Sequence, residues 1–384
     1  MSNREHEPDR AILVGLDFGQ LGFLESLEEL GLLAVSAGIV PRAYISGKRS
    51  KPDSALFAGS GKVEEIRAAA QREDAGMAIF NHELSPAQER NLEKALGIRV
   101  VDRASLIIDI FAQRAKSHEG KLQVELAQLE RSSTRLIRGW THLERQRGGT
   151  GFLGGMGETQ LEIDRRLIGR RVKVVKDELV RIKKQRDVQR RSRHRSGILS
   201  VSLVGYTNAG KSTLFNKLTH AGSYEADQLF ATLDTTTRRL YMEGTGQLVM
   251  SDTVGFIREL PHTLIEAFRA TLEETVHADV LLHIVDSSSA VRNDQIDEVN
   301  KVLVEIGAGA IPQILVWNKI DKSDVGAGYD RDEYGKISRV RLSARTGVGL
   351  EGLRIALTEF AVSKAALRTV QALGGAEGSS VGNY

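Results

Sequence analysis

The chain has 384 residues, a net charge of +3, 41% hydrophobic residues and no cysteine. This length is enough for two or three domains with ordinary hydrophobic cores, and the lack of cysteine excludes disulfides and thiolate metal sites. Neither a signal peptide nor an apolar run of membrane-spanning length is visible. We therefore expect a cytoplasmic protein without a membrane span.

Residues 1–118 are predicted to form a small α/β domain with a mostly parallel sheet. Apolar, strand-like runs occupy 11–18, 31–40, 76–80 and 98–102, and helical patterns occupy 62–72, 86–96 and 103–115. The sequence "GSGK" at 59–62 is nucleotide-like, but it lacks the spacing of a P-loop, and Val63 stands where Ser or Thr is required. We interpret it as a turn and a helix start.

Residues 119–196 are predicted to form an antiparallel helical hairpin, because two apolar seams have heptad spacing. The seams are Leu122, Leu126, Leu129, Ser133, Leu136, Trp140 and Leu143, and then Leu161, Ile168, Val172, Val175, Leu179 and Ile182. Six glycines at 145–158 separate them, and glycine breaks helices. The apolar tip residues Phe152, Leu153 and Met156 either form a contact surface or fold back onto the hairpin.

The positive charge is concentrated in the second helix of this hairpin. Residues 165–195 contain 14 Lys and Arg but three acids, Asp177, Glu178 and Asp187. Such a block on a nearly neutral chain is typical of a protein with a polyanionic partner. A solvated helix face is the other interpretation, and the charge run alone does not distinguish the two.

Residues 197–364 again alternate strands and helices, which predicts a second α/β domain. Strand-like runs include 198–205, 247–252, 280–286 and 313–318, and helices are expected from 211 and over 263–276, 294–306 and 349–361. Residues 365–384 end in a Gly/Ser-rich stretch, and we expect a disordered tail there.

The sequence "GYTNAGKS" at 205–212 matches G-x-x-x-x-G-K-[ST] between a strand and a helix, which is the context of a P-loop. Its backbone N–H groups can donate to phosphates. Lys211 would neutralise charge on the β- and γ-phosphates, and the Ser212 hydroxyl would bind Mg²⁺ directly. A chance glycine-rich turn would not explain strand, loop and helix in register.

The sequence "NKID" at 318–321 follows another predicted strand and favours guanine as the base. The Asn318 amide can pair with the O6/N7 edge of guanine, and the Asp321 carboxylate can accept from N1–H and the 2-amino group. Adenine would leave these polar groups unpaired. "SAR" at 343–345 ends the next strand, where the Ala344 N–H could also reach O6.

Two further segments are expected to sense the γ-phosphate. Asp252 ends an apolar strand and can hold Mg²⁺ through water, while the Gly255 N–H can contact the γ-phosphate. The segment "FATLDTTTR" at 230–238 supplies the switch threonine, and spacing leaves open Thr232, Thr235, Thr236 and Thr237.

Phe256 stands where many GTPases have the glutamine that orients the attacking water. A phenyl ring cannot hold a water molecule. The sequence therefore predicts slow intrinsic hydrolysis and a need for some other group.

These motifs resemble those of HflX-type GTPases over about residues 10–362. The resemblance is carried by "GYTNAGKSTLFN", "LFATLDTTTR", "DTVGFI", "NKID" and "SARTG", preceded by "GKLQVELAQL" and "GETQLEIDRR". It implies an N-terminal α/β HflX domain, a helical linker and a Ras-like P-loop GTPase domain with a mixed, mostly parallel sheet. It also implies a GTP/GDP switch that binds the large (50S) ribosomal subunit and its rRNA and splits or rescues stalled ribosomes. Thr232 is the direct Mg²⁺ ligand that the resemblance implies.

The chain departs from the family pattern at three positions. Gly154 and Met156 stand where the hairpin loop commonly has Arg and Pro, in a loop thought to approach rRNA, and Thr235 replaces a common proline. Related GTPases with a hydrophobic residue at the Phe256 position compensate with a monovalent cation or a partner-supplied group. Asn208 in the P-loop is the candidate for holding K⁺.

The expected site divides by role. Lys211, Thr232, Gly255 and Asn208 are the catalytic candidates, and Ser212, Thr232 and, through water, Asp252 are the Mg²⁺ ligands. The nucleotide-contacting set is Gly205, Tyr206, Thr207, Asn208, Ala209, Gly210, Lys211, Ser212, Thr213, Phe230, Ala231, Thr232, Leu233, Asp234, Asp252, Thr253, Val254, Gly255, Asn318, Lys319, Ile320, Asp321, Ser343, Ala344 and Arg345.

Two other functions remain open at the level of sequence. A GTPase that serves RNA modification or ribosome assembly could grip RNA with the basic hairpin, although no second active site is visible. A non-enzymatic, nucleotide-gated RNA-binding scaffold would keep GTP as a structural ligand. We expect a monomer in each case.

Overall fold

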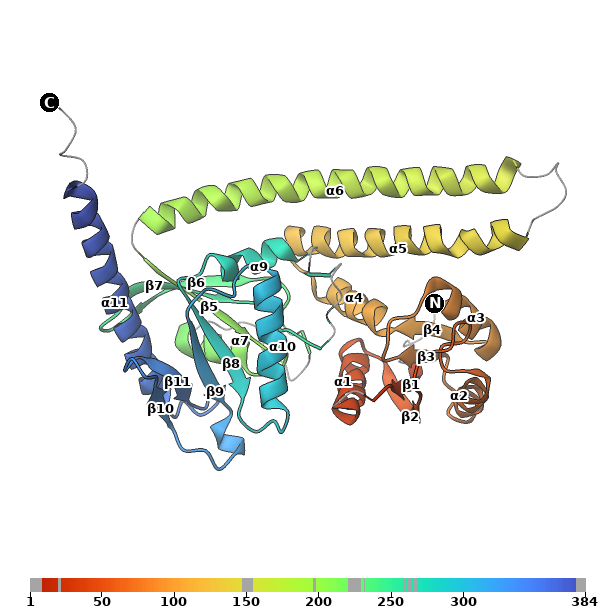
Figure 1. Ribbon diagram of the computed structural model, residues 1–384, viewed down its shortest axis with the longest axis horizontal. Helices are drawn as coiled ribbons and strands as arrows, with labels where there is room; N and C mark the ends of the chain where they lie inside the picture. The colour runs from red at the N-terminus through yellow and green to blue at the C-terminus, as the bar shows by residue number, and fades with distance from the viewer. Residues whose placement is uncertain are drawn as a thin grey trace, which may run out of the picture. The chain divides into compact units, whose positions relative to one another are not determined.

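The computed structural model describes residues 9–19, 22–146, 155–195, 198–219, 229–230, 232–258, 260, 264–265 and 268–377. The chain divides into two compact units (Figure 1). The first contains Met1–Arg186, Asp227–Leu233 and Arg258–Ala270, and the second contains Asp187–Ala226, Asp234–Ile257 and Thr271–Tyr384. Within the described ranges, every helix is too short or too polar to cross a membrane.

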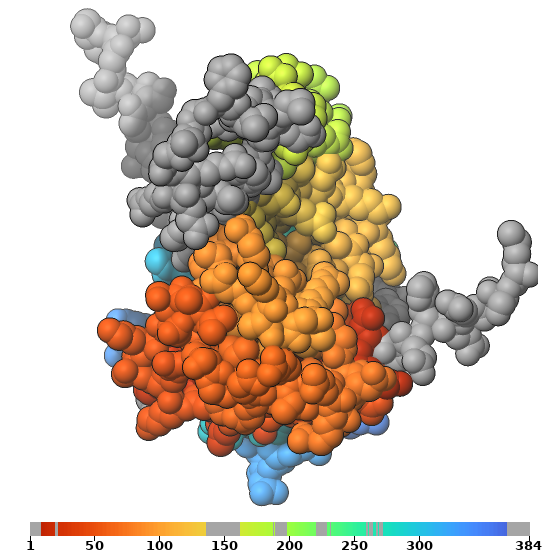
Figure 2. Space-filling view, turned by 90° about the vertical axis from the view of Figure 1, so that its right-hand side faces the viewer, coloured from red at the N-terminus to blue at the C-terminus, as the bar shows by residue number. Residues whose placement is uncertain are grey.

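A four-stranded parallel sheet forms the centre of the first unit, with the strand order β2-β1-β3-β4. Its elements are β1 (Arg10–Asp17), α1 (Phe23–Ser36), β2 (Val40–Lys48), α2 (Ser60–Arg72), β3 (Met77–Phe80), α3 (Pro86–Leu96), β4 (Arg99–Asp102) and α4 (Arg103–Arg114). In Figure 2, the atoms coloured red-orange to orange, which run along the chain from β2 to α4, form one continuous surface. The predicted α/β architecture with a parallel sheet is confirmed.

The strand predicted over 31–40 is wrong, because this stretch holds the end of α1 and the start of β2. Leu30, Leu33 and Ala34 are fully buried at helical spacing, so the apolar run marks the inner face of a helix. The strand β2 lies at the edge of the sheet and includes Pro41 and Arg42. Edge strands tolerate proline and charge, so this strand has no clear apolar signature.

Helices α5 (His118–Gln146) and α6 (Gly155–Arg195) lie side by side and form the predicted antiparallel hairpin (Figure 1). Their buried seam consists of Leu122, Leu126 and Val175, flanked by Leu129, Val172, Leu179 and Ile182. Ion pairs cross the seam from α5 to α6, at 2.6 Å between Glu119 and Arg186 and at 2.8 Å between Glu130 and Lys176. The tip at 147–154, with Phe152 and Leu153, lies outside the described residues, as does the side chain of Met156.

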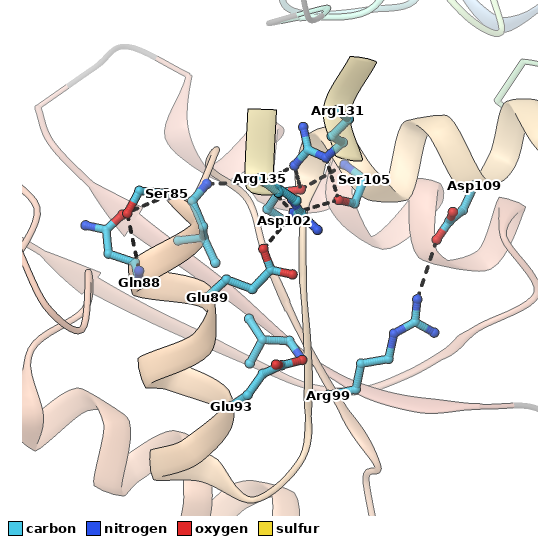
Figure 3. Close-up of polar contacts among 12 residues, drawn as sticks. Ser85, Gln88, Glu89, Glu93, Arg99, Asp102, Ser105, Asp109, Arg131 and Arg135 are labelled. Carbon is cyan, nitrogen blue, oxygen red and sulfur yellow. Dashed lines mark hydrogen bonds and ion pairs between the residues drawn. The ribbon is translucent and has the colours of Figure 1, made fainter. Parts of the chain in front are cut away.

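A buried carboxylate joins α5 to the sheet of the first unit (Figure 3). Asp102 at the end of β4 caps α4 by accepting from the Ser105 N–H at 2.8 Å. It also accepts hydrogen bonds from Arg131 of α5 and forms an ion pair with Arg135 of the same helix at 3.8 Å. Arg135 in turn pairs with Glu89 of α3 at 2.6 Å. The Asp102 side chain is fully buried, so these cations are required to balance its charge.

The second unit is built on a seven-stranded sheet with the order β10-β11-β9-β8-β5-β7-β6. Only the described pairs β6–β7 and β10–β11 are antiparallel, which confirms the predicted mixed, mostly parallel sheet. Its elements are β5 (Leu199–Gly205), α7 (Lys211–Thr219), β6 (Thr236–Met242), β7 (Gly246–Asp252), α9 (Arg269–Val276), β8 (Val280–Asp286), α10 (Arg292–Glu305), β9 (Gln313–Asn318), η1 (Ile320–Lys322), β10 (Gly328–Arg331), β11 (Ile337–Arg341) and α11 (Leu350–Glu377). Leu214 and Phe215 of α7 and Leu353 and Leu357 of α11 fill the core on one face of this sheet, and α10 packs over β8 and β5.

Two features of the second unit correct the sequence prediction. The edge strand β10 was not expected, because "GYDR" has no apolar alternation. Helix α11 continues to Glu377, whereas we expected the helix to end at 361 and a disordered tail to begin at 365. Residues 364–373 contain three alanines, two leucines, one lysine and one arginine. These are strong helix formers, which explains the extension.

We predict that Asp102→Asn destabilises the first unit by about 3 kcal/mol, because it leaves the partly buried cation of Arg131 without its charge partner. Amide hydrogen exchange of β4 and α4 in the full chain measures this loss. Asp74→Asn is the matched control, since Asp74 pairs with Arg10 but its side chain is 91% exposed, and its effect should stay below about 1 kcal/mol. Equal protection in the two variants would contradict a structural role for the buried cluster.

Candidate nucleotide-binding site

The P-loop joins β5 to α7, and its backbone shape depends on two glycines. Gly205 has a φ of 146°, and a Cβ there would lie 2.3 Å from the carbonyl oxygen of Ile284. Gly210 has a φ of 92°, and its Cβ would lie 2.2 Å from Nδ2 of Asn318. A side chain at either position would push the loop away from its neighbours. Asn208 has a φ of 58°, a conformation that Asn adopts more readily than most residues.

Lys211 lies buried at the start of α7, inside the loop. Its Nζ donates to the carbonyl oxygens of Gly205 at 3.0 Å and Tyr206 at 2.7 Å. Burial lowers the pKa of Lys211 to about 8, although the Asp252 carboxylate acts in the opposite direction. The P-loop carbonyls thus hold the amine where the charge of a bound phosphate would favour its protonated form.

Ser212 and Asp252 offer oxygen ligands of the kind that Mg²⁺ prefers. The Ser212 hydroxyl donates to Oδ2 of Asp252 at 2.7 Å, and Asp252 is 1% exposed at the end of β7. Magnesium ions in nucleotide sites combine one or two such protein oxygens with waters and phosphate oxygens. This pair therefore fits a Mg²⁺ site that a nucleotide completes.

The segment that follows β7 is hydrogen-bonded to the P-loop. The Thr207 N–H donates to the Phe256 carbonyl at 2.7 Å, and the Phe256 N–H donates to the Gly205 carbonyl at 3.1 Å. A Cβ on Gly255 would lie 2.9 Å from Cα of Thr207 and 3.0 Å from Nζ of Lys211, so glycine is required at this position. The Phe256 side chain is 1% exposed, so its ring is an interior packing group.

The other end of the site contains the expected base-recognition residues. Asn318 is buried at the end of β9, where Nδ2 donates to the Ala209 carbonyl at 2.9 Å and Oδ1 accepts from the Ala344 N–H at 2.8 Å. The N–H that we expected to reach guanine O6 is thus bonded to Asn318. Asp321 is exposed, and its Oδ1 accepts from the Ser343 hydroxyl at 2.6 Å.

The side chains of several expected contact residues are buried or bonded to other protein groups. Thr253 is buried and donates to the Leu203 carbonyl at 2.6 Å, and Val254 and Ile320 are buried apolar residues. Lys319 pairs with Asp286 at 2.8 Å. These residues hold the loops in place, so their side chains are less suited to touching a ligand.

The second unit brings together the P-loop, residues 252–256, residues 318–321 and residues 343–345. The expected switch residues Phe230, Thr232 and Leu233 belong to the first unit, and Ala231 lies outside the described residues. Thr232 and Asp234 are half-buried. The first unit therefore contains part of the segment that the sequence assigned to γ-phosphate sensing.

Sequence reasoning missed the aromatic contacts that hold this segment. Phe230 and Phe268 both meet Phe111 of α4 edge-on, with ring centroids at 4.6 Å and 4.8 Å. The Leu229 N–H also donates to the Ser36 hydroxyl at 3.1 Å. These partners are far apart in the chain, and no local pattern in the sequence connects them.

Arg258 makes a second, polar contact within the first unit. Its guanidinium donates to the Gly22 carbonyl at 3.1 Å, and its own carbonyl accepts from Arg103 at 3.2 Å. Arg103 is 3% exposed, donates to Asn81 at 2.8 Å and pairs with Glu29. Gly22 and Asn81 follow β1 and β3, between which the strand order reverses. Ligands commonly bind at such a point in α/β sheets, and here the chain's own Arg258 occupies it.

The "GSGK" sequence begins α2 at Ser60, with Gly59 at the cap position, which confirms the predicted turn and helix start. Lys62 donates to the Ser46 carbonyl at 2.9 Å and pairs with Glu65 at 2.6 Å. Its amine is engaged by protein groups.

Three family models match successive parts of the chain. "GTP-binding GTPase N-terminal" matches residues 24–112, "GTP-binding GTPase Middle Region" matches residues 114–193, and "50S ribosome-binding GTPase" matches residues 200–319. The three matches together cover most of the chain.

Curated relatives and one solved structure are similar over nearly the whole length. GTPase HflX of Escherichia coli is 52% identical over 97% of this chain and 87% of its own length. GTPase HflX of Magnetococcus marinus is 45% identical over 96% of this chain and 85% of its own length. A crystal structure of SsGBP in complex with GDP superimposes with a TM-score of 0.51 at 25% identity, covering 92% of this chain and 99% of that one.

We predict that Lys211→Met stabilises the second unit of the nucleotide-free protein by up to about 3 kcal/mol at pH 7, since burial penalises the ammonium. The folded-state pKa of about 8 is below the ordinary 10.5, so between these values the unfolded chain binds more protons at this site. Wild-type stability therefore rises with pH across that window, and the advantage of the variant should shrink.

Urea unfolding at pH 7 and pH 10 tests this, followed by Trp317 fluorescence in a Trp140→Phe background. Lys217→Met on the same helix is the control, because Lys217 is exposed and should show no pH-dependent difference. A pH-independent effect of Lys211→Met would contradict the burial account.

Proposed function

This chain belongs to the HflX family of GTPases, and we propose that it is a Mg²⁺-dependent switch whose GTP form binds the large (50S) ribosomal subunit. In this proposal it splits or rescues stalled ribosomes in the cytoplasm as a monomer. Family membership supports GTP hydrolysis as its reaction. The proposed working parts are residues 1–118, 119–196 and 197–364, with the GTPase chemistry in the last.

The proposed chemistry depends mainly on positioning and charge. Lys211 neutralises phosphate charge, Gly255 donates its N–H to the γ-phosphate, and Ser212, Thr232 and Asp252 would hold Mg²⁺. When bound, Mg²⁺ offsets the charge that develops on the phosphate oxygens. Asp321 recognises guanine, while Asn318 acts on the base and also holds the loops that surround it.

The observation that carries the switch proposal is the packing of Phe230 and Phe268 on Phe111. Phe230 precedes Thr232 by two residues, and Phe268 follows Gly255 in the same connection. A change in either segment with the γ-phosphate would alter packing against α4. Because packed interiors have discrete arrangements, such a change can reach the N-terminal unit and its hairpin.

The outer surface of α6 supports an RNA partner. Glu125 and Glu130 of α5 neutralise Arg171 and Lys176. Six more exposed basic residues of this helix have no ion pair in the described structure, and these are Arg165, Arg166, Arg170, Lys173, Arg181 and Lys184. Rows of unpaired Lys and Arg bind phosphate backbones by releasing counterions.

We predict that the chain co-sediments with 50S particles in a non-hydrolysable GTP analogue and much less in GDP, with weaker retention on 30S. Changing Arg165, Arg166, Arg170 and Lys173 to Glu should weaken 50S binding. The salt dependence should also flatten by roughly 0.7–0.9 log units per lost phosphate contact.

The control for these variants reverses four exposed bases elsewhere, Arg67, Arg72, Lys301 and Arg354. It should leave both 50S binding and its salt dependence close to wild type. An unchanged salt dependence in the α6 variant would mean that α6 is a solvated face. Nucleotide-independent sedimentation would contradict the switch.

The missing glutamine is replaced, in our proposal, by a K⁺ ion beside the P-loop. Asn208 is exposed in the loop, and its side-chain oxygen is available to a cation. A monovalent cation there would offset charge between the β- and γ-phosphates, as an arginine finger does elsewhere. The buried ring of Phe256 has no part in this step.

We predict that GTP turnover is about tenfold faster or more in KCl than in NaCl at equal ionic strength, and that Asn208→Ala removes the difference. Asn91→Ala, at a site distant in sequence, should retain it. Equal rates in the two salts, with and without 50S particles, would leave a ribosome-supplied group as the catalytic partner.

A further inference from the structure

One part of the second sheet has an incomplete layer of helices. α11 packs on one face of β11 and β10, while α10 packs over β8 and β5 (Figure 1). Gln313, Leu315 and Trp317, on the face of β9 opposite α11, are only half-buried, whereas Ile314, Val316 and Asn318 on the other face are buried. Parallel strands in α/β proteins are usually covered by helices on both faces, so this uncovered area is unusual.

Arginine side chains cover the area instead. The Arg339 guanidinium lies 4.4 Å from the ring centroid of Trp317, and the Arg292 guanidinium lies 5.1 Å from it. Strand register places Arg341 beside Trp317 and Arg339 beside Leu315, so these residues share one face of the sheet. We call Arg292, Trp317, Arg339 and Arg341 the arginine–tryptophan face.

Each member of this face carries a donor with no acceptor. Nε of Arg292, Nε1 of Trp317, Nε of Arg339 and Nε of Arg341 are buried and have no hydrogen-bond partner in the described structure. These groups can only donate, and an unmet buried donor destabilises a fold. Four such donors within one set of residues leave the hydrogen bonding of this face incomplete.

Charge points to the same conclusion. Asp330 pairs with Nη2 of Arg341 at 3.1 Å and with Nη1 of Arg339 at 3.4 Å, which leaves three guanidinium groups against one carboxylate. Both pairs use terminal nitrogens, and the side chains of Arg339 and Arg341 remain 38% and 30% exposed. Arg292 also begins α10, whose cap residue Val291 supplies no side-chain acceptor. A helix N-terminus favours an anion, and here a cation stands beside it.

We propose that the arginine–tryptophan face is the docking surface for an α-helix of a partner protein that carries carboxylates on successive turns. A helix fits the half-buried strands, and carboxylates bind the exposed part of a guanidinium group with two parallel hydrogen bonds. Single-stranded nucleic acid fits less well, because base stacking needs an aromatic face and the guanidinium groups lie over that of Trp317.

The test uses the full chain, ¹⁵N-labelled, with a Trp140→Phe change so that the indole N–H signal of Trp317 stands alone. The probes are a synthetic helical peptide with glutamates four residues apart, the same peptide with glutamines, and an oligouridylate of matching charge. The glutamate peptide should shift the Trp317 signal and bind about tenfold more tightly than the glutamine peptide.

Two substitutions test the chemistry of the face. Arg339→Gln and Arg341→Gln should each weaken peptide binding by about tenfold, and Arg339→Lys should not restore it, since Lys lacks the bidentate edge. Arg354→Gln is the control, because Arg354 is an exposed arginine of α11. GTP affinity, measured on every variant, reports that the unit is folded and is independent of ribosome binding.

Three outcomes would overturn the proposal. The first is equal affinity for the glutamate and glutamine peptides. The second is binding of the glutamate peptide without a shift of the Trp317 signal. The third is an oligouridylate that binds more tightly than the glutamate peptide and shifts the Trp317 signal. The last outcome would make the face a nucleic-acid surface.

Discussion

The side chain of Asn318 is the contact on which the nucleotide site depends. It is 2% exposed, and its two polar atoms bond the Ala209 carbonyl of the P-loop and the Ala344 N–H of the "SAR" loop. Gly210 lacks a Cβ where the same amide passes. The buried side-chain amide of Asn318 therefore sets the distance between the P-loop, which would hold the phosphates, and the loop that would hold the base. Since an unmet buried amide is costly, the geometry of both ends persists without a ligand.

A second close approach explains why Phe256 contributes no catalytic side chain to this site. Two backbone hydrogen bonds join Phe256 to the P-loop, and Gly255 has no room for a side chain beside Thr207 and Lys211. The ring of Phe256 then turns into the interior. This backbone positions donors well, but it supplies no group to orient water. A rate gain must come from added charge, which is why the proposed function includes a cation or a partner.

Much of the site could be predicted because its chemistry is local in sequence. The P-loop, "NKID" and the end of β7 each lie within a few residues, and the structure places them together. The errors arise where non-local packing decides. β2 and β10 are edge strands with polar residues, and the run at 31–40 is apolar because α1 is buried there. The contacts of Phe111 with Phe230 and Phe268 join segments far apart in the chain, so no local sequence pattern predicts them.

Strand β9 connects the nucleotide site to the arginine–tryptophan face by the simplest rule of β structure. Successive side chains point to opposite faces, so Asn318 lies toward the P-loop while Trp317 lies on the uncovered side. Lys319, the next residue, has a left-handed φ of 62° and pairs with Asp286 at the end of β8. Strand β9 is therefore fixed by hydrogen bonds on the side of the P-loop, whereas its other face is only half-buried. A helix docked on Trp317 would therefore act on the strand that carries Asn318, whereas Phe230 and Phe268 connect to α4 by separate contacts.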